Sequence, residues 1–114
     1  MKAKLPFIYL FLTCQFLQPA ISGPTYYTTF GSVDCGEWVN QSKQSPATRT
    51  WLLGYMSGLA GMHNLNDHLD NPLQKIDSAQ QIYVWMDNYC QKNPLKRVSE
   101  GGIDLFIELM KLPK

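Results

Sequence analysis

The sequence predicts an all-α fold: a compact bundle of about four helices stapled by one disulfide, after a cleaved signal peptide. Three observations predict it. The N-terminus has the form of an export signal, and the rest of the 114-residue chain suffices for one domain. Apolar residues in that remainder recur at intervals of three and four, which is the period of a helix. Two cysteines remain after the signal, and an even number in an exported chain indicates a disulfide.

The first 22 residues have the three parts of a secretory signal peptide. Met1–Lys4 is short and basic, Leu5–Leu17 is mostly apolar, and Ala20 and Ser22 are small residues suited to a cleavage site. The apolar run has about 13 residues, fewer than the roughly 20 that cross a bilayer. We therefore predict a signal peptide over 1–22 and a periplasmic protein; an uncleaved anchor is the alternative.

The three cysteines have different predicted fates. Cys14 lies inside the apolar run of the signal, and the residues before it match a lipobox poorly, so we expect it to be removed rather than lipidated. Cys35 and Cys90 are predicted to form the disulfide. Closing a loop of about 55 residues is worth about 4 kcal/mol in the chain-entropy model.

Residues 23–31 are rich in Pro, Gly, Thr and aromatic residues without a helical period, and are predicted to form an extended N-terminal arm. A single helical domain is predicted over 32–114. Its first helix begins near Ser32 or Asp34, and Asp34 and Glu37 have the spacing of a capping box. The residues that follow at helical intervals and are expected to form one buried stripe are Cys35, Trp38 and Val39.

The stretch RTWLLGYMSGLAGM belongs to a second helix, predicted over 46–61, with Ser45 as N-cap and Pro46 at the first helical position. Small residues lie between its apolar ones: Gly54, Ser57, Gly58 and Gly61. Each interior Gly costs a helix about 1 kcal/mol relative to Ala. We therefore expect this face to pack closely against another helix. The helix is too short and too polar at its start to cross a membrane.

Two more helices complete the predicted bundle after a polar loop over 62–76, which is either a surface elaboration or a binding loop. The third helix begins at Asp77 or Ser78 and ends at Asn93-Pro94. Its apolar face is Ile82, Trp85, Met86, Tyr89 and Cys90. The fourth is predicted from Pro94 to about Leu109. Its stripe is Leu95, Val98, Leu105, Phe106 and Leu109, and Gly101-Gly102 is either a break or a second close-packing point.

The sequence indicates no enzyme. One group of residues has metal-ligand types: His63, Asp67, His68 and Asp70. Their spacing fits neither an H-x-x-x-H pair nor an EF-hand, so we expect a solvated polar loop rather than a metal site. Gly54 to Gly58 reads G-x-x-S-G rather than the G-x-S-x-G of a nucleophile elbow. No cofactor fingerprint is present, and we expect no catalytic residue, cofactor or metal.

The charge does not select a partner. Without the two lysines of the signal, the eight remaining Lys and Arg face nine Asp and Glu. No basic patch indicates nucleic acid or an anionic membrane surface. The residues that we expect to be available to a partner are Tyr26, Tyr27 and Phe30 of the arm and His63, Asp67, His68 and Asp70 of the loop. The sequence is also compatible with a homodimer.

Three segments together resemble small bacterial periplasmic proteins: Cys35-Gly-Glu-Trp38, Trp51-Leu-Leu-Gly-Tyr-Met-Ser-Gly58 and Trp85–Leu95. The chain is similar over about residues 34–110 to HdeA/HdeB-like proteins and to Rap/Tai-type immunity proteins of type VI secretion. Both groups pair an early Cys with a central G-Y-x-x-G helix and a later Y-C-x-x-N-P or Y-x-x-x-H-P segment. The resemblance implies the Cys35–Cys90 bridge and a packing helix around Gly54 and Gly58, and it transfers no catalytic residue.

The two groups imply different functions. An HdeA-like chaperone unfolds partly in acid, which favours a charge-rich chain, whereas only 17% of this chain is charged. An immunity protein needs a stable fold, to which the core residues Trp38, Trp51 and Trp85 are suited. We predict a small periplasmic protein-binding protein, toxin-neutralising or associated with secretion or conjugation. An HdeA-like acid-stress chaperone is the alternative.

Overall fold

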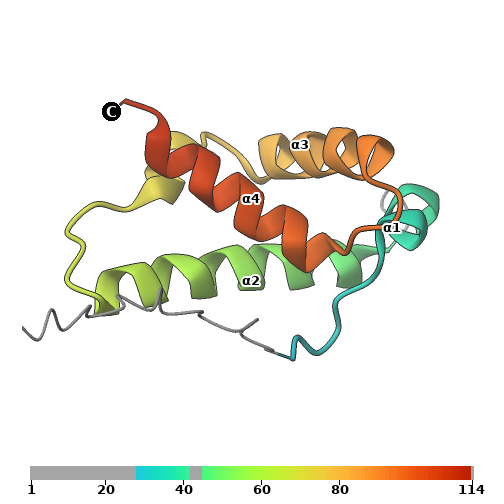
Figure 1. Cartoon of the computed structure of the whole chain (residues 1–114), viewed down its shortest axis with the longest axis horizontal. Helices are drawn as coiled ribbons and strands as arrows, with labels where there is room; N and C mark the ends of the chain where they lie inside the picture. The colour runs from blue at the N-terminus through green and yellow to red at the C-terminus, as the bar shows by residue number, and fades with distance from the viewer. Residues whose placement is uncertain (1–27, 42–44, 114) are drawn as a thin grey trace, which may run out of the picture.

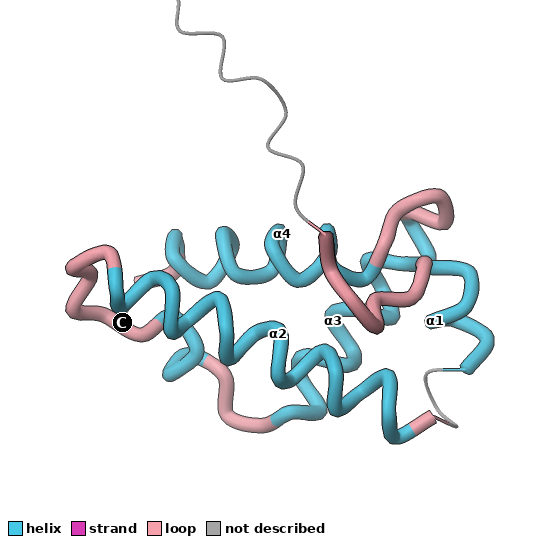
Figure 2. Tube along the Cα trace, turned by 90° about the horizontal axis from the view of Figure 1, so that it is seen from below, coloured by secondary structure: helices cyan, strands magenta, loops and turns pink. Residues whose placement is uncertain are grey.

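The computed structural model describes residues 28–41 and 45–113, and in these ranges the chain is all-α (Figure 1). Its elements are α1 (Cys35–Gln41), α2 (Pro46–Leu65), the 3-10 helix η1 (Pro72–Lys75), α3 (Ala79–Lys92) and α4 (Val98–Lys111). Figure 2 shows helices and loops without a strand over these residues. The predicted helical bundle is confirmed. The signal peptide over 1–22, Cys14, Tyr26 and Tyr27 lie outside the described residues.

Helix α4 is the element around which the others are arranged, because it contacts α2, α3 and η1, while α1 packs against α3 (Figure 1). The residues buried between them are apolar and come from all four α-helices: Cys35, Trp38, Leu52, Met56, Ile82, Met86, Cys90, Val98, Leu105, Phe106 and Leu109. Burial of such side chains is the main favourable term in folding. The indole NH of the fully buried Trp38 donates a 2.8 Å hydrogen bond to Asp87 Oδ1.

Gly101 and Gly102 are a close-packing point and not a break, since α4 continues through both. A Cβ on Gly101 would lie 2.7 Å from Met86 Sδ and 2.8 Å from the ring of Tyr89 on α3. A Cβ on Gly102 would lie 2.9 Å from the ring of Tyr55 on α2. The missing side chains therefore let both neighbouring helices approach the α4 backbone.

The small residues of α2 do not pack inside the bundle, and the prediction that they do was wrong. Gly54, Ser57, Gly58 and Gly61 are exposed, and a Cβ added to any of these three glycines would meet no atom within 4 Å. Helix α2 turns its other side to the core, with Leu52 and Met56 buried. The large apolar side chains bury more surface than the small ones, and this decides which side faces inward.

Helix boundaries follow local chemistry with a few displacements. Asp34 caps α1 as predicted, since its Oδ1 accepts a 2.8 Å hydrogen bond from Glu37 N. Val39 is 47% exposed and is not part of the buried stripe, so that prediction was wrong; α1 ends two residues later, at Gln41. The prediction that α4 begins at Pro94 was wrong: it begins at Val98, after a turn that leaves Leu95 98% exposed.

The Cys35–Cys90 disulfide is present and joins α1 to the last turn of α3. Beside it, the chain before α1 pairs with the chain before α4. Cys35 N donates to Lys96 O at 2.9 Å, and Val98 N donates to Val33 O at 3.0 Å. These bonds flank an isolated antiparallel bridge between Asp34 and Arg97. One end of the bundle is thus held by a covalent link and a backbone ladder.

The described part of the arm, residues 28–31, crosses α2 at Trp51. The Trp51 indole NH donates a 2.6 Å hydrogen bond to Phe30 O. Gly31 has φ +78°, and a Cβ there would lie 2.8 Å from the Trp51 ring. Glycine is required at this position for both reasons. The Trp51 ring also stacks on Tyr55, with centroids 4.9 Å apart.

Candidate functional site

Two features of the described residues stand out beyond the core: the outer face of α2 and a group of ionisable side chains at its C-terminal end. We define the outer face by its exposed residues, which are Ala47, Thr50, Gly54, Ser57, Gly58, Gly61, Met62 and Leu65. They recur at three- and four-residue intervals, so they share one side of the helix. None of them carries a charge.

The outer face is apolar as well as small. Ser57 Oγ donates a 2.8 Å hydrogen bond to Leu53 O one turn earlier, so its hydroxyl is satisfied within the helix. Met62 and Leu65 are 58% and 79% exposed. The cationic group of α2, the Arg49 guanidinium, lies over the Tyr83 ring of α3 at 4.8 Å and is turned away from this face. The outer face is therefore smooth, uncharged and without side chains at its three glycines.

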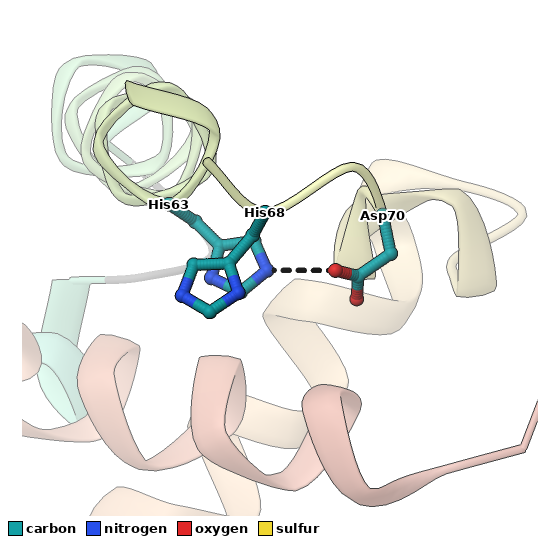
Figure 3. Close-up of side chains that lie close together, drawn as sticks. All are labelled: His63, His68 and Asp70. Atoms are coloured by element: carbon teal, nitrogen blue, oxygen red, sulfur yellow. Dashed lines mark hydrogen bonds and ion pairs between the residues drawn. The ribbon is translucent and has the colours of Figure 1, made fainter. Parts of the chain in front are cut away.

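The second feature gathers His63, His68 and Asp70, which we call the His–Asp cluster (Figure 3). The predicted loop over 62–76 was wrong at its start, because α2 continues to Leu65 and carries His63 in its last turn. Asp67 then adopts φ +62°, which reverses the chain after the helix. Asp67 N donates to Asn64 O at 3.2 Å in this turn. The reversal brings His68 back onto His63.

The two imidazole rings are stacked, with centroids 4.2 Å apart and planes at 4°. The His63 side chain is only 11% exposed, and its ring meets Phe106 of α4 edge-on at 5.7 Å. His63 is therefore fixed by packing rather than solvated, contrary to the expectation of a solvated loop. His68 is exposed.

Asp70 completes the cluster. Its Oδ1 lies 3.0 Å from His63 Nε2 (Figure 3). This hydrogen bond lowers the pKa of the Asp70 carboxyl below its ordinary value, since the bond favours the ionised form. The donor atoms of the three side chains all lie within 4.8 Å of one another. The arrangement combines two imidazole nitrogens with one carboxylate, which are groups that exchange protons and coordinate transition metals.

The segment that carries Asp70 is tied to the end of α4. Asn71 caps η1 by accepting a 3.1 Å hydrogen bond from Leu73 N. Lys75 Nζ donates to the carbonyl oxygens of Leu109 and Leu112 at the C-terminal end of α4, where helical carbonyls lack their usual partners one turn later. A pocket of about 580 Å³ lies beside Asp70 and is also lined by Asn71, Gln74, Lys75, Leu112 and Pro113. The Lys75 contact could not be predicted from the sequence.

The structure thus separates the residues that the sequence grouped as partner-binding. His63, His68 and Asp70 come together, whereas Asp67 serves the turn and lies outside the cluster. Phe30 is exposed beside Trp51. Sequence reasoning missed the outer face of α2 as an accessible surface. The signal was present in its lack of charge, because an uncharged run suits a buried helix and a binding surface equally.

Comparisons with protein-family models, with curated proteins and with solved structures found no match to this chain. None of the helices in the described ranges combines the length and apolar character needed to cross a membrane.

Proposed function

We propose that this chain is a small periplasmic protein-binding protein and that it binds its partner through the outer face of α2. The observation that carries the proposal is the exposure of Gly54, Gly58 and Gly61 in the middle of a 20-residue helix.

The glycines of the outer face weaken α2 without any return inside the domain. Each interior Gly costs about 1 kcal/mol relative to Ala, so the three together cost about 3 kcal/mol. Gly101 and Gly102 offset the same cost by letting other helices come close, but no atom lies near a Cβ at Gly54, Gly58 or Gly61. A partner whose backbone approaches α2 closely would supply the missing contact.

The uncharged surface also suits protein binding. Contiguous apolar surface on a small protein marks an interaction site more often than scattered single residues do. Met62 and Leu65 extend the face beyond the glycines and offer side chains for a partner to bury. Trp51 and Tyr55 lie three residues before Gly54 and Gly58, so their stacked rings border the face on one side.

The biological role that we propose is neutralisation of a toxin, or another interaction associated with secretion or conjugation. Both need a surface presented by a stable scaffold. The Cys35–Cys90 disulfide is compatible with an oxidising compartment. The fully buried Trp38 and the close approach at Gly101 describe a firmly packed core. These features support a fold that stays closed while it binds.

An HdeA-like acid-stress chaperone is the second candidate, and the His–Asp cluster favours it. The hydrogen bond with His63 lowers the pKa of the Asp70 carboxyl, so the ionised form of Asp70 stabilises the fold, and this stability is lost when strong acid protonates Asp70. This would loosen one end of the bundle at low pH.

A charge placed on the outer face tests the leading proposal. We would capture partners from the native organism's envelope and secreted proteins with the wild-type chain, with Gly58→Glu and with Val84→Glu. Val84 is exposed on α3, so this variant is a matched control for an added carboxylate. We expect the wild type and Val84→Glu to retain a partner that Gly58→Glu loses, with equal far-UV circular dichroism. Equal capture by all three would rule out the outer face.

An acid titration tests the alternative. The oxidised wild-type chain is taken from pH 7 to pH 2 while near-UV circular dichroism and the aggregation of an acid-sensitive client are followed. Loss of the near-UV signal together with client protection would make the chaperone role primary. A fold that persists and protects no client would remove that role and leave the binding proposal.

A further inference from the structure

We propose that the His–Asp cluster binds one divalent transition-metal ion of the Zn²⁺ type through His63 Nε2, a ring nitrogen of His68 and the Asp70 carboxylate. The proposal does not depend on the proposed function: it concerns the corner after α2 and not the outer face. It carries no catalytic claim.

The donor set defines the class of ion. Imidazole nitrogen and carboxylate oxygen are ordinary ligands of Zn²⁺, and three protein ligands with an open fourth position describe its non-structural sites. Ca²⁺ and Mg²⁺ prefer oxygen donors, of which the cluster supplies only those of one carboxylate. Ions that favour imidazole, such as Zn²⁺, Ni²⁺ and Cu²⁺, are therefore selected over the hard cations.

The distances suit a single ion after a small adjustment. Ligand atoms about 2.0 to 2.1 Å from a tetrahedral Zn²⁺ lie about 3.3 Å from one another. His63 Nε2 and Asp70 Oδ1 are 3.0 Å apart, close to that value, and they already point toward each other (Figure 3). The widest separation in the cluster is 4.8 Å. The ion would replace the hydrogen bond between His63 and Asp70.

One side chain must move, and it is the one that is free to do so. Stacked parallel rings direct their nitrogen lone pairs in parallel planes, so His63 and His68 cannot converge on one ion as they lie. His63 is held by Phe106 and by the helix, whereas His68 is exposed and follows the turn at Asp67. A rotation of the His68 side chain between staggered rotamers brings its ring toward the other two donors.

Two of the three ligands are set on supported elements. His63 stands on α2 and packs on α4, and Asp70 directly precedes η1, which Lys75 ties to the end of α4. Supported ligands lose little freedom on binding, which favours affinity. The Asp70 side chain is 40% exposed and borders the 580 Å³ pocket, so a water molecule can reach the fourth position.

Calorimetric titration with Zn²⁺ tests the proposal, using the tag-free full-length gene product in the form that an expression host secretes. The chain is first treated with a chelator, and Mg²⁺ serves as the hard-cation control. We expect one Zn²⁺ per chain, no heat of binding with Mg²⁺, and visible absorption bands of tetrahedral Co²⁺ when Co²⁺ replaces Zn²⁺.

Variants assign the site. His68→Ala and Asp70→Asn each remove one ligand at an exposed or partly exposed position, so the fold is retained, as near-UV circular dichroism would verify. Asp67→Asn is the matched control, since it removes a carboxylate of the same turn that lies outside the cluster and Asn tolerates a positive φ. We expect each ligand variant to lose more than about 100-fold in affinity, beyond the loss typical of an outer-shell change. Asp67→Asn should bind as the wild type does.

Two results would overturn the proposal: no saturable binding of Zn²⁺ by the wild type, or equal binding by His68→Ala, Asp70→Asn and the wild type. Partner capture by Gly58→Glu is unaffected by either result, so failure of the metal site and failure of the binding face are distinguishable.

Discussion

We expect Gly→Ala to have opposite effects on the free energy of unfolding in α4 and in α2. At Gly101 an added methyl group would lie 2.7 Å from Met86 Sδ and 2.8 Å from two ring carbons of Tyr89. Carbon atoms in contact prefer about 3.5 to 4.0 Å. Both neighbours would have to shift, although Met86 is fully buried and the Tyr89 ring is stacked on Trp85 with centroids 5.2 Å apart.

The effect of Gly→Ala on stability depends on whether the cost of overpacking exceeds the gain in helix propensity. Overpacking of a core costs about 1 to 3 kcal/mol, and Gly→Ala within a helix returns about 1 kcal/mol. Gly101→Ala is therefore expected to lower the free energy of unfolding by about 1 kcal/mol, taking the middle of that range. At Gly54 no atom lies within 4 Å of an added Cβ, so Gly54→Ala keeps only the helix gain of about 1 kcal/mol. The two variants should differ by about 2 kcal/mol.

Thermal unfolding of the oxidised chain, followed by far-UV circular dichroism, measures both variants. One kcal/mol moves the Tm of a domain of this size by about 4 to 8 °C, so Gly54→Ala should raise the Tm and Gly101→Ala should lower it. Urea titration gives the same comparison as free energies. A Tm raised equally by both substitutions would refute the close approach of α3 to α4 at Gly101.

Further predictions concern the disulfide, the start of α4, the core and the metal. Replacing both Cys35 and Cys90 by Ser should lower the free energy of unfolding in urea by up to about 4 kcal/mol. The pKa of Glu100 is lowered from 4.5, first by the hydrogen bond from the α4 N-cap amide, so its ionised form adds stability that is full above pH 4.5 and lost as the pH falls through the lower folded value. Glu100→Gln keeps an acceptor for the Arg97 amide but loses the charge, so it should be less stable than wild type at pH 7, with the gap closing in urea titrations below pH 4.5. Trp38→Phe removes the donor to Asp87 and leaves a cavity, so urea titration should show a loss of about 2 to 3 kcal/mol. Zn²⁺ at about 100 times its Kd should stabilise the chain by about 2.7 kcal/mol, and calorimetry would contradict the site if the Tm did not rise.

The starts of α1 and α2 were predictable from the sequence because they depend on neighbouring residues. Asp34 caps α1 and Ser45-Pro46 begins α2 through local backbone chemistry. Which side of α2 faces inward was not predictable in the same way. Charge did not decide it, because the side with Leu52 carries Arg49 while the side with the glycines is uncharged; the choice between them depends on how much apolar surface α4 covers.

The candidate site was predictable in residue types but not in geometry. The sequence shows His63, His68 and Asp70 within eight residues, a spacing without a helical or loop signature. Their approach depends on two facts of conformation: α2 extends to Leu65, and Asp67 takes a positive φ. Asp is enriched in the left-handed region, but only a small fraction of residues other than Gly adopt it, so the reversal of the chain could not be inferred from an aspartate alone.

The two ends of the bundle are closed by different kinds of link, so they should open in a fixed order. At the end with Cys35 and Cys90, a covalent bond and the backbone hydrogen bonds beside it hold the helices together. At the end with Lys75 and His63, only non-covalent hydrogen bonds and ring contacts hold the described elements together. Weakly held regions open at lower free energy than the whole domain. We therefore expect the end with Lys75 and His63 to open first. The helices would then separate at that end while the end with the disulfide stays closed. Closing again costs little conformational entropy, because the disulfide still keeps the helices close to one another.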